Sequence, residues 1–345
     1  MMPGFRRALL TVLLAAAALT SALPETVHAR DQIKIVGSST VFPFTTTVAE
    51  RFSKAGKFKA PVVESTGTGG GFKLFCDGVG VDTPDINDAS RPITAGERAS
   101  CAKNGVAAVA EFTVGYDGII LAGASKGAIF DVSLEQLWKA TAKTVPLRGK
   151  LVANPYRQWS DIDPKLPRKP IAIYGPAPNH GTRDAFVELV MEPSCEKAPE
   201  IAALIKDEQK KVCGVVREDH VWTDVSEDYG LVMGKLSGNP TALAVFTFSY
   251  LDQNRDKIHA ATMGGVSATL ETIASRHYPL SRPLFIYVKQ GHVGQIPGLA
   301  EFVTEYLSER AAGEEGYLTD KGLIPMPRAQ ALLQRAAAAK LTGIR

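Results

Sequence analysis

Short apolar segments near the start of the chain are each followed by a small polar turn and then by a stretch with helical spacing. Residues 33–36 precede a Gly-Ser-Ser-Thr turn at 37–40, and apolar residues at 44, 48, 49 and 52 then recur at helical intervals. The pattern repeats over 61–77 and over 85–104. Such alternation predicts an α/β fold with a largely parallel sheet, whose polar turns gather at the carboxyl ends of the strands.

The remainder of the chain continues this alternation without an internal repeat or a low-complexity linker. Ser133 with Gln136 three residues later is typical of a helix start. We expect strands at 106–112, 118–122, 171–174, 243–248 and 284–288, a turn at 159–162, and helices at 133–138, 183–191, 299–307 and 329–340. The missing linker indicates that two domains are joined by strands that cross between them.

Size and charge limit the class of protein further. The chain has 345 residues, 45% of them hydrophobic and 22% charged, which is a globular composition sufficient for about two domains. A net charge of +3, spread over the whole chain, does not indicate a nucleic-acid partner. The six histidines form no H-E-x-x-H pair, so we expect no metal site and no cofactor.

Residues 1–29 have the features of a cleavable export signal. Arg6 and Arg7 precede an apolar stretch over 8–23, and Val27-His28-Ala29 offers a small-residue cleavage site before Arg30. The apolar stretch, about 16 residues long, is short for a membrane-spanning helix. An uncleaved anchor is the alternative, and Arg6-Arg7 could also belong to a twin-arginine signal. We therefore predict that the mature protein is exported.

Four cysteines lie in the exported part, where disulfides persist. We predict the pairing that is local in sequence, Cys76 with Cys101 and Cys195 with Cys213, which is one of three possible connectivities. Neither spacing is C-x-x-C, which disfavours zinc and thioredoxin-type sites. Free thiols are the alternative.

Four polar segments follow predicted strands, and their chemistry suits a small anion. They are residues 38–40, 66–71, 90–91 and 179–182. The N–H groups that start a helix are unpaired, and glycines and small hydroxyl residues let an anion approach them. Ser and Thr add donors, and Arg91 adds a planar fork that matches an oxyanion.

Each segment alone also has an ordinary structural explanation. Ser39 or Thr40 can be a helix cap, Arg91 an ion-paired surface residue, and His180 a loop histidine. The glycine-rich segment lacks the Gly-Lys-Ser/Thr of a Walker A loop, and Phe72 stands where a dinucleotide motif needs its third glycine. All four segments in one strand-turn-helix context favour an anion site.

The chain resembles the PstS-like periplasmic phosphate-binding proteins of phosphate ABC importers. The matching stretches are residues 37–43 (GSSTVFP), 67–73 (GTGGGFK), 85–92 (DINDASRP) and 180–182 (HGT). The resemblance implies two α/β lobes with a two-strand hinge: residues 30–116 with 277–345 as lobe I, and 117–276 as lobe II. It implies that the lobes close on the ligand between Ser39, Thr40, Thr68, Ser90 and Arg91 on one side and His180, Gly181 and Thr182 on the other.

The sequence departs from the family pattern at three positions. His180 replaces the Ser of the usual Ser-Gly-Thr, and Pro176 stands where an Arg is common. Some members have an Asp where this chain has Arg91. That Asp accepts a proton from phosphate and so rejects sulfate, which has none to give. Because this chain lacks the Asp, the motif does not predict discrimination between phosphate and sulfate. Asp88 is a poor substitute if it points away along the strand. We interpret Arg183 as a solvated helix residue rather than a replacement charge.

These observations predict a monomeric, non-enzymatic solute-binding protein that captures inorganic phosphate and delivers it to an ABC transporter permease. One alternative is a binding protein for sulfate, molybdate or a phosphonate, and another is a surface or adhesion role without transport. An exported serine hydrolase is the third alternative. Residues 100–103 fit S-x-x-K without its partner motifs, and Ser39, His180 and Asp184 could form a triad.

Overall fold

The computed structural model describes residues 30–178, 180–225 and 228–341, so the predicted export signal at 1–29 lies outside the described residues. The strands are β1 (Lys34–Gly37), β2 (Val62–Ser65), β3 (Ile86–Ala89), β4 (Val109–Ala124), β5 (Asp131–Val132), β6 (Thr144–Leu147), β7 (Lys150–Ala153), β8 (Ile173–Pro176), β9 (Trp222–Val225), β10 (Leu243–Thr247), β11 (Ile258–Ala260), β12 (Thr262–Met263) and β13 (Ser281–Lys289).

The helices alternate with these strands along most of the chain. They are α1 (Phe42–Lys54), α2 (Thr68–Phe75), α3 (Ala95–Lys103), α4 (Leu134–Thr141), α5 (Trp159–Ile162), α6 (Gly181–Phe186), the π-helical η1 (Val187–Met191), α7 (Glu192–Cys195), α8 (Pro199–Ala202), α9 (Lys206–Cys213), α10 (Tyr229–Gly238), α11 (Phe248–Gln253), α12 (Leu270–Ala274), the 3-10 turn η2 (Gln290–His292), α13 (Leu299–Tyr306), α14 (Glu309–Ala312), the 3-10 turn η3 (Thr319–Lys321) and α15 (Arg328–Leu341).

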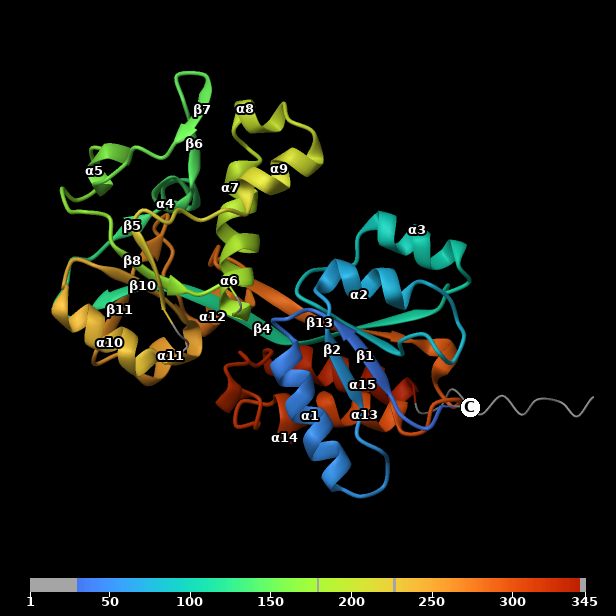
Figure 1. The fold of residues 1–345 in the computed structure, drawn as a ribbon. Coiled ribbons are helices and arrows are strands. Elements are labelled where there is room, and N and C mark those ends of the chain that lie inside the picture. Colours follow the sequence, from blue (N-terminus) through green and yellow to red (C-terminus); the bar gives the residue numbers. More distant parts are fainter. Residues whose placement is uncertain (1–29, 179, 226–227, 342–345) are drawn as a thin grey trace, which may run out of the picture.

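One curled, mixed sheet runs through both lobes, in the order β2-β1-β3-β13-β4-β10-β8-β9, with β11 also on β4. The pairs β1–β2, β1–β3, β8–β10 and β8–β9 are parallel, whereas β13 pairs antiparallel with β3 and β4. Strand β4 pairs with β13 along its first part and with β10 and β11 along its second. The two lobes in Figure 1 are therefore joined by strands that both share, as the sequence predicts.

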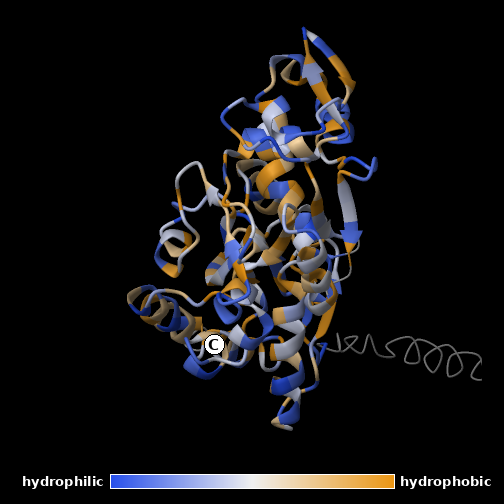
Figure 2. Ribbon diagram, turned by 90° about the vertical axis from the view of Figure 1, so that its left-hand side faces the viewer, coloured by the Kyte–Doolittle hydropathy of each residue, from blue (hydrophilic) through white to orange (hydrophobic). Residues whose placement is uncertain are grey.

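Helices cover both faces of the sheet in the first lobe. Helix α2 packs on β1 and β3 and contacts α3, while α1, α13 and α15 pack together beneath the sheet. Each layer buries an apolar cluster, one around Phe72 and Tyr287 and the other around Val48 and Phe302. Hydrophobic segments accordingly lie along the strands in Figure 2, and hydrophilic ones lie at loops and outer helix ends.

Several sequence predictions differ from the observed elements in their boundaries. The two strands expected at 106–112 and 118–122 form the single strand β4, because its pairing passes without a gap from β13, up to Gly118, to β10, from Ile119. The turn expected at 159–162 is the short helix α5. The helix start expected at Ser133 is confirmed, with a capping box between Ser133 and Gln136. In the described part of the chain, no helix is both long and apolar enough to cross a bilayer.

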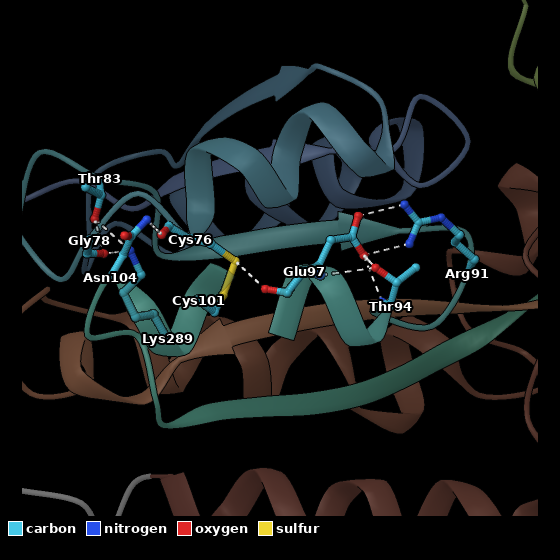
Figure 3. The surroundings of a disulfide bond; sticks show 9 residues. All are labelled: Cys76, Gly78, Thr83, Arg91, Thr94, Glu97, Cys101, Asn104 and Lys289. Atoms are coloured by element: carbon cyan, nitrogen blue, oxygen red, sulfur yellow. Dashed lines mark hydrogen bonds and ion pairs between the residues drawn. A yellow bond between two sulfur atoms is a disulfide. The ribbon is translucent and has the colours of Figure 1, made fainter. Parts of the chain in front are cut away.

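Both predicted disulfides are confirmed. Cys76–Cys101 joins the end of α2 to α3, and Cys195–Cys213 joins α7 to α9. Figure 3 shows the first of these beside the polar contacts of α3. Each disulfide fixes a helix that follows one of the predicted anion segments.

The glycines of the second polar segment let α2 approach the sheet closely. The polar segment predicted at 66–71 overlaps α2, which begins at Thr68, so the first turn of α2 contains the glycines. A Cβ at Gly71 would lie 2.0 Å from Asn87 Oδ1 and 2.6 Å from the Cα of Gly37. Because no side chain fits there, glycine is required for α2 to bring Thr68 to the end of β3.

Substitution of two neighbouring glycines tests this packing. Gly71→Ala should lower the unfolding free energy by about 1–3 kcal/mol, because the added methyl overpacks the contact with β1 and β3. Gly70→Ala is the matched control: its Cβ would lie 3.7 Å from the Cβ of Thr66, an ordinary contact. It should raise stability by about 0.5–1 kcal/mol. Urea unfolding followed by circular dichroism measures both, and equal effects would contradict the packing argument.

Candidate functional site

A cavity of about 460 Å³ lies between the two lobes and contains five of the eight predicted ligand residues. These are Ser39, Thr40, His180, Gly181 and Thr182. The other lining residues are Phe42, Pro43, Phe44, Asp117, Tyr229, Thr247, Ser249, Tyr250, Gln253, Thr319, Asp320, Lys321 and Gly322. The first and fourth polar segments therefore meet across the junction, although they are far apart in sequence.

The starts of two helices face each other at this cavity. Ser39 and Thr40 precede α1, whose N-cap is Val41, and His180 is the N-cap of α6. A Cβ at Gly181 would lie 3.5 Å from both the Ser39 carbonyl oxygen and the Thr40 Cα, so the two backbones nearly touch. Two helix N-termini carry partial positive charge, and an anion between them would relieve their repulsion.

Thr68 and Ser90 form a buried pair of hydroxyls. Thr68 starts α2, and Ser90 directly follows β3. Their Oγ atoms are 3.1 Å apart, and the backbone N–H of Ser90 donates to Thr68 Oγ1 at 3.2 Å. The second and third polar segments therefore come together, as the parallel order of β1, β2 and β3 requires.

Arg282 links this hydroxyl pair to the cavity, and sequence reasoning missed it. Its side chain is only 7% exposed. Nη2 donates to Thr40 Oγ1 at 2.9 Å, Nε donates to Asp117 Oδ2 at 3.3 Å, and Nη1 donates to Glu188. Glu188 also accepts a hydrogen bond of 3.1 Å from Ser90 Oγ. A buried guanidinium with fixed donors is the strongest oxyanion ligand that this region offers.

The sequence contained a signal for Arg282. The tripeptide Ser-Arg-Pro occurs at residues 90–92 and again at 281–283. The second copy directly precedes the apolar run of β13. Only the first copy follows a short predicted strand and lies in a motif of the resemblance.

Arg91 has a different partner from the one predicted. Its guanidinium binds both carboxylate oxygens of Glu97, at 2.9 and 2.8 Å, and its side chain is 40% exposed (Figure 3). Arg91, like Thr68, Ser90 and Arg282, is not among the residues that line the cavity. Glu97 at the same time completes the capping box of α3 with Thr94. These contacts give Arg91 a structural role at the start of α3, and its contact with an anion stays a prediction.

Arg183 is not the solvated residue that we expected. Its side chain is 12% exposed, and Nη1 donates to the Pro176 carbonyl and to Asp224, at 2.8 and 2.9 Å. The guanidinium also lies over the Trp222 ring. Arg183 therefore ties the start of α6 to β8 and β9.

Two buried carboxylates have raised pKa values. Burial raises the pKa of Asp117, and the neighbouring Arg282 opposes that shift. Burial raises the pKa of Asp88 to about 8, against a hydrogen bond from Thr45. Thr45 lies on α1, and Asp88 is not among the residues that line the cavity. Asp88 is therefore no substitute for a proton-accepting Asp at the ligand.

The pH dependence of stability tests the burial of Asp88. The folded chain keeps a proton on Asp88 that the unfolded chain loses near the ordinary pKa of 3.8. The unfolding free energy therefore falls as pH rises from about 4 to 8, by up to about 1.4 kcal/mol per pH unit. Between pH 4 and 8 the unfolding free energy of Asp88→Asn, measured with urea, should rise relative to that of the wild type. Asp31→Asn, at an exposed site, should differ from the wild type by a constant amount between pH 5 and 8, and the same constancy in Asp88→Asn would refute the burial effect.

The arrangement does not favour a serine hydrolase. A triad needs the imidazole between hydroxyl and carboxylate, but Ser39 Oγ donates directly to Asp184. In the described residues, no group of three or more His, Cys, Asp or Glu side chains could hold a metal ion. The site combines hydroxyl and backbone N–H groups with a buried guanidinium, which suits binding.

The family described as "PBP superfamily domain" matches residues 24–310. "Protein SphX" of a Synechocystis species is 32% identical over 86% of this chain and 78% of its own length. "Phosphate-binding protein PstS" of Staphylococcus saprophyticus is 27% identical over 86% of this chain and 81% of its own length.

The fold is also similar to solved structures. A structure described as a possible phosphate binding protein, from Planctomyces limnophilus, has a TM-score of 0.72 and 27% identity and covers 90% of this chain and 98% of its own. PstS from Borrelia burgdorferi has a TM-score of 0.60 at 17% identity and covers 86% of this chain and 100% of its own, which supports the fold alone.

Proposed function

Because the chain belongs to the PBP superfamily, we propose that it captures inorganic phosphate between its two lobes and delivers it to an ABC permease. The relative from Staphylococcus saprophyticus is named as a phosphate-binding protein, and the structure from Planctomyces limnophilus is described as a possible one. The chain acts, in this proposal, as a monomeric periplasmic binding protein without catalytic activity. Its lobes comprise residues 30–116 with 277–345, and residues 117–276.

The observation that carries this proposal is the convergence of donors from both lobes on one small region. Arg282 contacts Thr40 and reaches Ser90 through Glu188, while Gly181 lies against Ser39 and Thr40. Hydroxyls, backbone N–H groups and a guanidinium are the donors that an oxyanion accepts. No apolar ligand would need this set.

Tight binding of an anion requires only a small number of hydrogen bonds to its charge. A micromolar complex needs about −8.2 kcal/mol. Hydrogen bonds to a charged group contribute roughly 1.5–3 kcal/mol each. Six to eight such bonds, less the cost of ordering the site, would give at least micromolar affinity.

Calorimetric titration tests the identity of the anion. Purified chain without residues 1–29 should bind inorganic phosphate with micromolar or tighter affinity. Preference for sulfate, molybdate or a phosphonate would support the alternative oxyanion carrier. Uptake of labelled phosphate by a strain that lacks this chain would then test delivery to a permease.

Two arginine variants locate the anion. Arg282→Gln should weaken phosphate binding at least about tenfold, because it removes a charge-assisted donor. Arg91→Ala should weaken it less, because Glu97 already engages that guanidinium. Calorimetry measures affinity, and the thermal unfolding midpoint shows whether each variant is folded. A folded Arg282→Gln variant that binds like the wild type would place the anion elsewhere.

A further inference from the structure

A carboxylate of the protein lies where the proposed ligand would find its strongest donors. Glu188, on η1 of the second lobe, accepts hydrogen bonds from Ser90 Oγ and from Arg282 Nη1, both of which belong to the first lobe. The same Glu188 oxygen receives both bonds. A carboxylate oxygen and a phosphate oxygen accept hydrogen bonds from the same donors.

We propose that Glu188 competes with phosphate for Ser90 and Arg282, so that phosphate binding displaces its carboxylate. This inference rests on the proposed function, which supplies the identity of the competing anion. The Ser90 hydroxyl has one proton, and Ser90 uses it to donate a hydrogen bond to Glu188. Thr68 is then the donor in its contact with Ser90. A phosphate oxygen can accept a hydrogen bond from the Ser90 hydroxyl only after the hydrogen bond between Ser90 and Glu188 is broken.

The charges around Arg282 lead to the same conclusion. Its guanidinium already has two carboxylate partners, Asp117 and Glu188. Adding a phosphate dianion beside both would place several negative charges around one cation, which is unfavourable at short range. Asp117 is buried on β4, whereas the side chain of Glu188 is 41% exposed. Glu188 is therefore the partner that can leave for solvent.

The helix that carries Glu188 is adapted to reach across the junction. The helical run from Gly181 to Cys195 changes to π-helical geometry at Val187, directly before Glu188. Such π segments often occur at functional sites. One turn earlier, Asp184 makes a second contact to the first lobe, at Ser39 Oγ. The run ends at Cys195, whose disulfide to Cys213 anchors it within the second lobe.

Phosphate titration of Glu188→Gln is the first test. Gln keeps the size of the side chain but removes the charge that holds it on Arg282. Because a partly exposed ion pair contributes up to about 1 kcal/mol, its removal should tighten phosphate binding about two- to fivefold. Unchanged affinity would overturn the proposal. Weaker binding would make Glu188 a ligand of phosphate and would also overturn it.

Glu196→Gln is the matched control. Glu196 is the C-cap of the same helical run, and its Oε1 lies 4.0 Å from Lys206 Nζ within the second lobe. The substitution removes the same charge from the same helix but no contact to the first lobe, so phosphate affinity should equal that of the wild type. An equal gain in both variants would reflect general charge and would overturn the specific competition.

Small-angle scattering without phosphate provides a readout that does not need the ligand. If Glu188 joins the lobes, Glu188→Gln should have a larger radius of gyration than the wild type and Glu196→Gln should not. Equal radii in all three proteins would overturn the proposal. A wild type that binds no phosphate would reject the proposed function, whereas the scattering result would still decide whether Glu188 holds the lobes together.

Discussion

The guanidinium of Arg282 is the point at which the two lobes and their shared strands meet. It lies at the start of β13 and donates to Thr40 before α1, to Asp117 on β4 and to Glu188 of the second lobe. A buried cation is costly unless it is paired and hydrogen-bonded, so these partners gather around the guanidinium. Arg282 therefore helps to position the polar segments relative to one another, although it belongs to none of them.

Local pattern was sufficient to predict most of the fold. Strand–turn–helix alternation placed β1, α1, β3 and α3 because each has its own periodicity and its own turn or cap. The length of β4 was not predictable in this way. Gly115, Asp117 and Gly118 interrupt the apolar pattern there, and their strand conformation depends on pairing with β13, which lies far along the chain.

The site was predictable wherever a residue acts through its own turn. Ser39, Thr40, His180, Gly181 and Thr182 lie at the cavity because helix starts at strand ends converge. Arg91 and Arg282 share the same tripeptide, and only tertiary structure distinguishes them: Glu97 lies six residues after Arg91, whereas Arg282 has partners from three distant segments. A sequence motif does not reveal such a difference in partners.

The position of β13 has a consequence for the order in which the protein can fold. β13 lies between β3 and β4, yet it is synthesised roughly 190 residues after β3. Contacts so distant in sequence form slowly and late. The amino-terminal lobe thus lacks a central strand until nearly the whole polypeptide has been synthesised. A chain that passes through a narrow channel before then would do so before the core of this lobe could form.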